Sequence, residues 1–275
     1  MIIYMENIRE YTNKKKQELK ERLSGKQPVF YIIQVGDVEA SNVYVRNKMK
    51  DCAEVGIKAE LLKLPESISQ CEFENLIYSL NDNENSVDAY MTQLPLPKHL
   101  DLGVLKFINP LKDADGFTGN GITNPATPQG IIDYLEGNNF KFEDANAVVI
   151  GRSDIVGKPM AKLLLDRNCN VRVVHSKTSS KNKQAALKGA DLIVVATGHR
   201  NTLTDDDLIE TSENCFIVDV GISRNNEGRW CGDCESVTIR ETTPVPGGVG
   251  LLTRLALLNN IVKLYDAKLR EQKEV

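Results

Sequence analysis

Short apolar runs alternate with amphipathic segments along nearly the whole chain, and this alternation limits the fold more than any other feature. Residues 28–35 (PVFYIIQV) are almost continuously apolar, which is typical of a strand buried on both faces of a sheet. Residues 6–23 and 41–55 instead carry apolar side chains at helical spacing, and Gly56 is placed to end the second helix. The alternation predicts an α/β fold with parallel sheets. Further strands are expected at 59–64, 87–94, 147–150, 171–174, 192–196 and 216–220, and further helices at 71–80, 128–135, 159–166 and 251–264.

The chain length of 275 residues suits two modest domains, at about 150 residues per domain. The alternation is interrupted once, by residues 95–127, which are rich in Pro, Gly, Asp and Asn and have the character of a crossing between domains. We therefore predict a first domain over residues 1–120, completed by a C-terminal helix over 251–275 that returns to it. A second, Rossmann-like domain is expected over residues 121–250.

The composition argues against several classes of partner. The formal net charge is −4, so the chain offers no electrostatic reason to bind nucleic acid. We find neither a signal segment nor an apolar run of about 18 residues, which predicts a cytoplasmic protein without a membrane partner. The six cysteines are scattered, and the pair Cys231 and Cys234, in what reads as a polar loop, has no second ligand pair for zinc. No metal is expected.

The second half of the chain contains a strand that runs into a glycine-containing turn. Residues 148–150 are followed by Gly151-Arg152-Ser153-Asp154-Ile155-Val156-Gly157-Lys158-Pro159 and then by a predicted helix. Glycine at both ends of such a turn permits a pyrophosphate to approach the N–H groups at the start of the helix. The spacing is wider than in Gly-x-Gly-x-x-Gly, so a plain βα turn stays open as an alternative.

The end of the next strand bears on the choice of cofactor. An NAD site of this type usually has a carboxylate there, which binds the ribose 2′-OH. Residues 171–174 are followed instead by His175-Ser176-Lys177-Thr178, which contains no carboxylate. A hydroxyl from Ser176 and a cation from Arg152 suit a 2′-phosphate, so NADP is favoured over NAD.

Candidate chemistry in the first domain comes from four polar residues. Tyr44 and Lys48 are spaced i, i+4 on a predicted helix and so share a face, although a solvated lysine beside a core tyrosine is an alternative. A lysine in a partly dry pocket is suited to proton transfer. Gln93 ends a predicted buried strand, where such sheets bind ligands. Asp115 lies in the polar crossing, where a turn-forming role before Gly116 is the alternative.

Several segments in their order resemble the bifunctional methylenetetrahydrofolate dehydrogenase/methenyltetrahydrofolate cyclohydrolase (FolD) family over residues 35–259. Each segment is moderately specific, and their shared order makes chance similarity improbable. The segments are Ser41-x-x-Tyr44-Val45-x-x-Lys48, Gln93-Leu94-Pro95-Leu96-Pro97, Lys112-Asp113-Ala114-Asp115-Gly116-Phe117, Gly151-Arg152-Ser153-x-Ile155-Val156-Gly157-Lys158-Pro159, Asp219-Val220-Gly221 and Thr243-Pro244-Val245-Pro246-Gly247-Gly248-Val249-Gly250.

The resemblance implies a folate site in the first domain, a Rossmann-like second domain and a cleft between them. Lys48 matches the catalytic lysine of the family, with Tyr44 and Gln93 as its partners, and Asp115 matches the residue that binds the pterin. The loop beside the folate is matched by Pro246, Gly247 and Gly248. The cofactor site is matched by Gly151, Arg152, Ser153, Gly157, Ser176, Thr197, Gly221 and Ile222.

The implied activity is oxidation of 5,10-methylenetetrahydrofolate with NADP, followed by hydrolysis of the methenyl product to 10-formyltetrahydrofolate. The family also implies a homodimer. The sequence departs from the family pattern at Thr92, at residues 250–253, at Cys234-Glu235 and in a shortened stretch over 118–128, but no departure removes a catalytic position. Two alternatives are another two-domain NADP-dependent dehydrogenase, of the shikimate or amino-acid type, and a cofactor-binding regulator without turnover.

Overall fold

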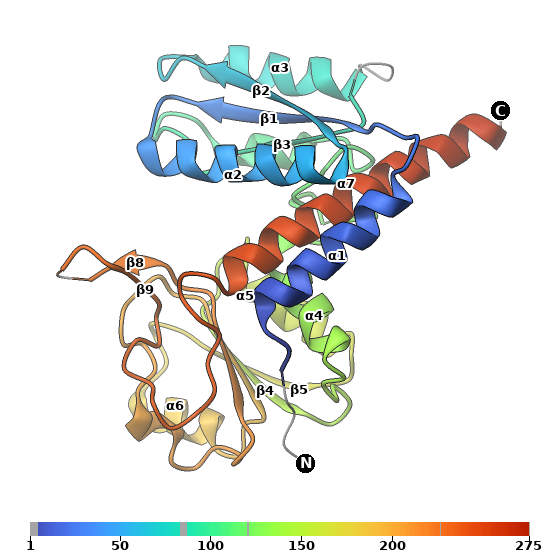
Figure 1. Ribbon diagram of the computed structural model, residues 1–275. Coiled ribbons are helices and arrows are strands. Elements are labelled where there is room, and N and C mark those ends of the chain that lie inside the picture. The colour runs from blue at the N-terminus through green and yellow to red at the C-terminus, as the bar shows by residue number, and fades with distance from the viewer. Residues whose placement is uncertain (1–4, 83–86, 120, 226, 275) are drawn as a thin grey trace. The chain divides into compact units, whose positions relative to one another are not determined.

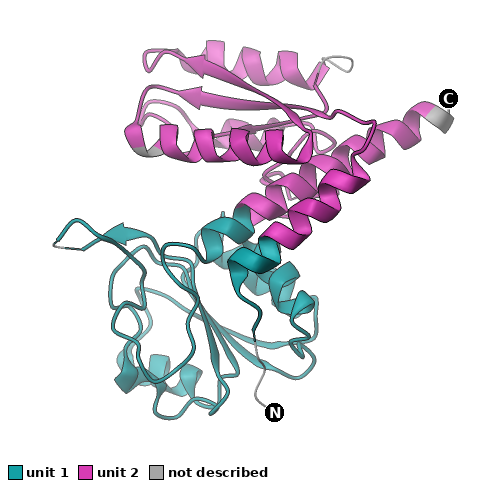
Figure 2. Cartoon of the chain, viewed as in Figure 1, with its two compact units in different colours: residues 1–12, 127–253 teal, residues 13–126, 254–275 magenta. Residues whose placement is uncertain are grey.

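The computed structural model describes residues 5–82, 87–119, 121–225 and 227–274. The chain forms two compact units: unit 1 comprises Met1–Thr12 and Thr127–Thr253, and unit 2 comprises Asn13–Ala126 and Arg254–Val275 (Figures 1 and 2). Helices α1 (Ile8–Arg22) and α7 (Val249–Glu274) each begin in unit 1 and end in unit 2. Residues 1–4, part of the stretch in which we expected no signal segment, lie outside the described residues.

The sheet of unit 2 has three parallel strands, with β1 (Val29–Val35) between β2 (Lys58–Leu64) and β3 (Ala89–Thr92). Helix α2 (Glu39–Val55) connects β1 to β2, and α3 (Gln70–Asp82) connects β2 to β3. Helix α2 ends where the sequence predicts, because Gly56 adopts a left-handed conformation with φ of 93° and its N–H bonds back to Ala53. The core of this sheet includes Ile33, Phe73 and Ile77, each fully buried.

The chain after β3 returns along the same strand. The Tyr90 N–H donates to the Lys112 carbonyl at 2.8 Å, and the Ala114 N–H donates to the Tyr90 carbonyl at 3.2 Å. Between the two passes lies a 3₁₀ helix, η1 (Leu102–Phe107), within the stretch that we expected to be only a crossing. This second pass beside β3 positions the polar segment that begins at Lys112.

Unit 1 contains a parallel sheet in the order β5-β4-β6-β7. Because the strands that follow β4 in the chain lie on opposite sides of it, the carboxyl end of β4 is a topological switch point. The strands are β4 (Asn146–Ile150), β5 (Asn170–Val174), β6 (Leu192–Val195) and β7 (Phe216–Asp219), and the helices are α4 (Ala126–Gly137), α5 (Gly157–Leu165) and α6 (Ser180–Leu187). The predicted fold class is confirmed.

Three small elements of unit 1 were not predicted. They are α6, the 3₁₀ helix η2 (Asp205–Leu208) and the hairpin of β8 (Ser223–Arg224) with β9 (Trp230–Cys231). Their sequences carry little periodic signal, since α6 buries only Leu187 and each hairpin strand has two residues. Among the described residues, no helix is long and apolar enough to span a membrane.

The N-terminal segment groups differently from our expectation, because its described residues up to Thr12 belong to unit 1 and not to the first domain. Tyr11 explains this: its ring packs edge-on against Tyr134 at 5.3 Å, and its hydroxyl donates to the Asp133 carbonyl at 2.8 Å. The Tyr134 hydroxyl donates in turn to the Glu6 carbonyl at 2.6 Å. The other unit boundaries, 126/127 and 253/254, fall shortly after the predicted 120/121 and 250/251.

Candidate active site

Lys48 in unit 2 projects from α2 toward the carboxyl end of β3. Its Nζ donates to Gln93 Oε1 at 3.0 Å and contacts Met91 Sδ at 3.3 Å. Gln93 is buried, and its Nε2 donates to the Leu94 carbonyl at 2.7 Å, which turns Oε1 toward the lysine. Burial lowers the pKa of Lys48, whereas the negative charge of Asp115 acts in the opposite direction. The site therefore holds an amine whose proton is more easily lost than usual.

Tyr44 lies one helical turn before Lys48 on α2, as the spacing predicts. Its side chain is 40% exposed, so it is not a core residue. The alternative of a core tyrosine is therefore wrong for this position. An exposed phenol beside a partly buried lysine is available to a ligand.

Asp115 follows the segment that runs beside β3, and its neighbour Asp113 forms the turn. The Asp113 carboxylate accepts from the N–H groups of Gly116 and Thr118, both at 2.8 Å. Among the described residues, none donates a hydrogen bond to the Asp115 carboxylate, which is half-buried. Burial raises the pKa of Asp115 to about 6, although the Lys48 ammonium lowers it. The turn-forming alternative thus applies to Asp113, and Asp115 is left with free acceptor oxygens.

Helix α7 holds this polar segment in place. The Asn260 side chain is fully buried and donates to the carbonyls of Ala114 at 2.9 Å and Asn124 at 3.0 Å. Nearer the amino end of α7, Arg254 forms a salt bridge with Asp51 of α2 at 2.9 Å. The residues of the unit 2 site are therefore supported by α2, β3 and the C-terminal helix together.

The turn after β4 in unit 1 has the form that a dinucleotide site needs. Gly151 adopts φ of 127°, and a Cβ there would lie 2.4 Å from the Ala196 carbonyl oxygen. A Cβ on Gly157 would lie 2.5 Å from the Gly151 carbonyl oxygen. The Ser153 hydroxyl accepts from the N–H groups of Val156 at 3.2 Å and Gly157 at 3.3 Å. Both glycines are thus required for close packing at the start of α5.

A cavity of about 400 Å³ opens at this edge of the sheet. It contains five of the predicted cofactor residues and, among the described residues that line it, no carboxylate. The lining residues are Ile150, Gly151, Arg152, Ser153, Val174, His175, Ser176, Thr178, Lys183, Ala196, Thr197, His199 and Thr202.

Three of the predicted cofactor residues do not line the cavity of about 400 Å³. Gly157 is buried at the start of α5, Gly221 is buried after β7, and Ile222 is 45% exposed. Conversely, sequence reasoning missed Lys183, whose Nζ donates to the Thr202 carbonyl at 2.8 Å. Lys183 belongs to α6, a helix that was not predicted, so no signal placed it near the cavity.

The loop matched to the folate contains a turn that excludes side chains. Gly247 adopts φ of 101°, and a Cβ on Gly248 would lie 2.3 Å from the Pro244 carbonyl oxygen. Pro246 precedes them. These three residues belong to unit 1, whereas Tyr44, Lys48, Gln93 and Asp115 belong to unit 2.

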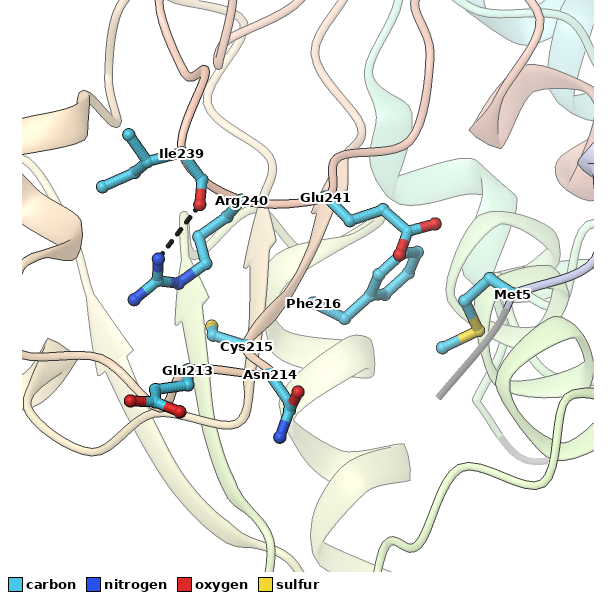
Figure 3. A pocket seen from close by; sticks show the side chains of 8 residues that line it. All are labelled: Met5, Glu213, Asn214, Cys215, Phe216, Ile239, Arg240 and Glu241. Carbon is cyan, nitrogen blue, oxygen red and sulfur yellow. Dashed lines mark hydrogen bonds between the residues drawn. The ribbon is translucent and has the colours of Figure 1, made fainter. Parts of the chain in front are cut away.

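Two other features of unit 1 contain no predicted site residue. A cavity of about 250 Å³ lies at the amino end of β7 (Figure 3) and is lined by Met5, Glu213, Asn214, Cys215, Phe216, Ile239, Arg240 and Glu241. Cys231 and Cys234 are both buried, so the prediction of a polar loop is wrong there. Burial raises the pKa of the Cys234 thiol, which keeps it unreactive. Among the described residues, no three His, Cys, Asp or Glu side chains group as metal ligands.

Comparison with known proteins gives consistent matches over both halves of the chain. Residues 4–115 match the family described as tetrahydrofolate dehydrogenase/cyclohydrolase, catalytic domain, and residues 125–269 match its NAD(P)-binding domain. The chain is 40% identical over 271 residues to the bifunctional protein FolD of Streptococcus agalactiae, which covers 94% of this chain and 92% of that protein.

Solved structures agree with this match. The bifunctional FolD enzyme of Campylobacter jejuni, a methylenetetrahydrofolate dehydrogenase/cyclohydrolase, superposes with a TM-score of 0.86 at 37% identity, covering 95% of this chain and 98% of that one. The Trypanosoma brucei methylenetetrahydrofolate dehydrogenase-cyclohydrolase, solved in complex with NADP and an inhibitor, has a TM-score of 0.86 at 28% identity. It covers 97% of this chain and 98% of that one.

Proposed function

The chain belongs to the tetrahydrofolate dehydrogenase/cyclohydrolase family, and we propose that it oxidises 5,10-methylenetetrahydrofolate with NADP⁺ and hydrolyses the methenyl product to 10-formyltetrahydrofolate. The observation that carries this proposal is the placement of Lys48. Its amine donates a hydrogen bond to Gln93. Burial lowers the pKa of this amine, and the charge of Asp115 raises it. The region that matches the catalytic domain thus contains a proton-transfer group next to a free carboxylate.

Lys48 serves the hydrolytic half of the reaction. Water adds to the methenyl carbon of the cationic substrate and loses one proton, which gives a neutral hydroxyl adduct. One C–N bond then breaks as the hydroxyl proton passes to the departing nitrogen, which leaves the formyl group on the other nitrogen. Because the pKa of Lys48 is lowered, a larger share of its amine is neutral and able to accept that proton. Gln93 restricts Nζ to one place through the hydrogen bond of 3.0 Å.

Asp115 serves to bind the pterin. An ionised carboxylate accepts two parallel hydrogen bonds, which matches the two neighbouring N–H donors of the pterin amide–amidine edge. The pKa of about 6 leaves this carboxylate mainly ionised at neutral pH. Its oxygens accept no hydrogen bond from the described residues, so they are available to the substrate.

NADP fits the cavity of unit 1. The glycines at 151 and 157 leave space for a pyrophosphate at the start of α5, and Arg152 and Ser176 suit the 2′-phosphate. Bound NADP⁺ supplies the hydride acceptor. The residues of the chain contribute position and charge, and the absence of a carboxylate among the lining residues favours NADP over NAD.

We also propose that the protein is a cytoplasmic homodimer. The strand β5 is an edge strand that pairs only with β4 among the described strands, and Val173 on it is 43% exposed. An unprotected edge strand is suited to pairing with a second copy. Light scattering of the purified chain should give twice the mass of one chain, and a single-chain mass would contradict the proposal.

The experiment for the function follows both activities in one cuvette. Adding 5,10-methylenetetrahydrofolate and NADP⁺ to the purified chain should raise the absorbance of reduced nicotinamide, and added methenyltetrahydrofolate should disappear faster than in buffer. Reduction of NADP⁺ with shikimate or an amino acid, and not with the folate, would support another two-domain dehydrogenase. Binding of NADP without turnover of any of these substrates would support a regulator.

A further inference from the structure

Two aspartates lie buried together in unit 1 and form no ion pair with any described residue. Asp219, at the end of β7, is 3% exposed, and Asp233 is fully buried. Asp219 Oδ1 accepts from the N–H groups of Gly221 at 3.1 Å and Asp233 at 2.9 Å, and its Oδ2 accepts from the Cys234 N–H at 2.9 Å. Asp219 thus fixes the backbone that carries Asp233.

Asp233 in turn fixes the loop that follows β6. Its Oδ2 accepts three hydrogen bonds, from Thr197 N at 2.7 Å, Thr197 Oγ1 at 2.8 Å and Gly198 N at 3.0 Å. Its Oδ1 has no partner among the described residues and lies against Gly221, where a Cβ would approach it to 2.0 Å. One carboxylate therefore contacts the loops after both β6 and β7.

The position of these loops in the sheet indicates which part of a dinucleotide they serve. With the strand order β5-β4-β6-β7, a dinucleotide lies across the carboxyl ends of the strands at the switch point. Ser176, suited to the 2′-phosphate on the adenosine half, follows β5, and Gly151, suited to the pyrophosphate, follows β4. Thr197 and Gly198 follow β6 on the other side, which is the side of the reactive nicotinamide half.

Burying two carboxylates without a cation is costly for the stability of the protein. The effect is visible at Asp219, whose pKa is raised by burial and by the neighbouring charge of Asp233. Hydrogen bonds from five backbone N–H groups and one hydroxyl offset part of that cost. A buried pair of this kind holds two loops in a single arrangement, which is what a hydride-transfer site requires.

We propose that Asp233 is a positioning residue for hydride transfer, fixing through Thr197 and Gly198 the loop that orients the nicotinamide half of NADP, with Asp219 holding Asp233 in place. This inference rests on the proposed dehydrogenase function. It adds a specific consequence: loss of the Asp233 carboxylate should impair the redox reaction and cofactor binding, while the cofactor-independent hydrolysis in unit 2 continues.

The chain offers a control that matches Asp233 in its hydrogen bonds, although it is partly exposed where Asp233 is fully buried. Asp205 accepts the same types of hydrogen bond, from Thr238 N at 2.8 Å, Thr238 Oγ1 at 2.6 Å and Ile239 N at 3.2 Å. It also lies in unit 1, but neither it nor its partners line the cavity of about 400 Å³. Asp233→Ala and Asp205→Ala therefore remove similar bonds at different distances from the cofactor site.

Three quantities are measured for the full chain and each variant: the Kd for NADP by calorimetry, the rate of NADP⁺-dependent oxidation of methylenetetrahydrofolate, and the rate of methenyltetrahydrofolate hydrolysis without NADP. We expect Asp233→Ala to weaken NADP binding and to lower kcat/KM for NADP by about tenfold or more relative to Asp205→Ala. The rate of hydrolysis should stay within about threefold of the wild-type rate, which is a smaller change than the expected tenfold loss in kcat/KM for NADP. Asp233→Asn, which keeps one acceptor oxygen, should show a smaller loss in the same reaction and serves if Asp233→Ala does not fold.

Parallel losses of both activities would overturn the proposal, because they indicate a general structural role. Equal effects of Asp233→Ala and Asp205→Ala on the Kd for NADP would overturn it as well. If the wild type oxidises no methylenetetrahydrofolate, the proposed function fails, and the comparison of NADP affinities still decides whether Asp233 acts on the cofactor site.

Discussion

Met91 contacts the Lys48 amine, and no sequence signal identified it. A methionine in a buried strand is typical of a core, but here its sulfur lies 3.3 Å from Nζ. Thioether sulfur is a weak acceptor that favours the charged form of the amine. Burial lowers the pKa of Lys48 and the charge of Asp115 raises it, and we expect the Met91 sulfur to add a small effect in the same direction as Asp115.

Replacing Met91 by Leu keeps the volume and removes the acceptor. The cost in stability should be below about 1.5 kcal/mol. With one acceptor fewer, the pKa of Lys48 should fall further below its usual value, so the lysine limb of the pH profile for methenyltetrahydrofolate hydrolysis should move to lower pH. Thr92→Val is the control, since the Thr92 hydroxyl is buried without a partner among the described residues. A profile unchanged by Met91→Leu would show that the sulfur does not matter.

The Asp115 carboxylate should matter to both activities equally. In Asp115→Asn an NH₂ donor replaces one acceptor oxygen and faces a pterin N–H, so one bond is lost and two donors oppose each other. The penalty on folate affinity should be about 1–3 kcal/mol, while NADP affinity is unchanged. Separate titrations of folate and NADP test this. Unchanged folate affinity and turnover would remove Asp115 from the folate site.

Asp115→Asn should raise the stability of the folded chain although it weakens folate binding. The pKa of Asp115 is raised to about 6 in the folded chain from 3.8, so the folded state binds more protons than the unfolded state between these values. Stability attributable to Asp115 therefore falls as pH rises from about 4 to 6, and the full cost is present at neutral pH. Asp115→Asn should unfold at a higher temperature than the wild type at pH 7.5, and the gain should shrink toward pH 4.

At the scale of elements, α7 supports the proposed folate site although none of the predicted catalytic residues lies on it. The two hydrogen bonds from Asn260 hold the segment that carries Asp115. Asn260→Ala should cost about 1–3 kcal/mol in unfolding free energy, because the buried Ala114 carbonyl loses this donor and the part-buried Asn124 carbonyl loses it as well. It should also weaken folate binding. Asn259→Ala, at a partly exposed neighbouring position, is the control, and equal effects of the two changes would contradict this role of α7.

The β4–α5 turn should determine the choice of cofactor. Each charge-assisted bond to the 2′-phosphate is worth about 1.5–3 kcal/mol, so Arg152→Ala should lower kcat/KM for NADP by at least about tenfold and leave that for NAD nearly unchanged. Steady-state kinetics with both cofactors measure the ratio. If the wild type uses NAD and NADP equally well, our interpretation of residues 175–178 is wrong.

At the scale of the whole molecule, the order and parallel pairing of the strands could be predicted from the sequence. The individual hydrogen bonds that support the candidate site could not. Strands such as Val29–Val35 are continuously apolar, so their parallel pairing followed from the alternation with helices. The contact of Lys48 with Gln93 was expected from the family resemblance alone, since 45 residues separate them and no periodicity relates them. Asp219 and Asp233 lie on either side of an unpredicted hairpin, and no period or spacing in the sequence relates them.

The grouping of the first twelve residues with unit 1 has no signal in the sequence for a similar reason. The Tyr11 hydroxyl bonds to a carbonyl 122 residues away, and an amphipathic pattern in residues 6–23 says nothing about such a partner. The turn around Asp113 was also hidden, because Asp113 and Asp115 are equally good turn formers in sequence. Only the observed bonds to Gly116 and Thr118 separate the structural aspartate from the available one.

The proposed function depends above all on Lys48 as the proton-transfer group, and Lys48 lies in unit 2, whereas the dinucleotide turn lies in unit 1. Hydrolysis of methenyltetrahydrofolate by Lys48→Met, measured beside the NADP affinity of the same preparation, addresses this directly. The variant keeps a long unbranched side chain but has no titratable amine. We predict that hydrolysis falls to the rate in buffer while the Kd for NADP stays at its wild-type value. Hydrolysis at the wild-type rate by a variant that still binds NADP would show that Lys48 is not the proton-transfer group.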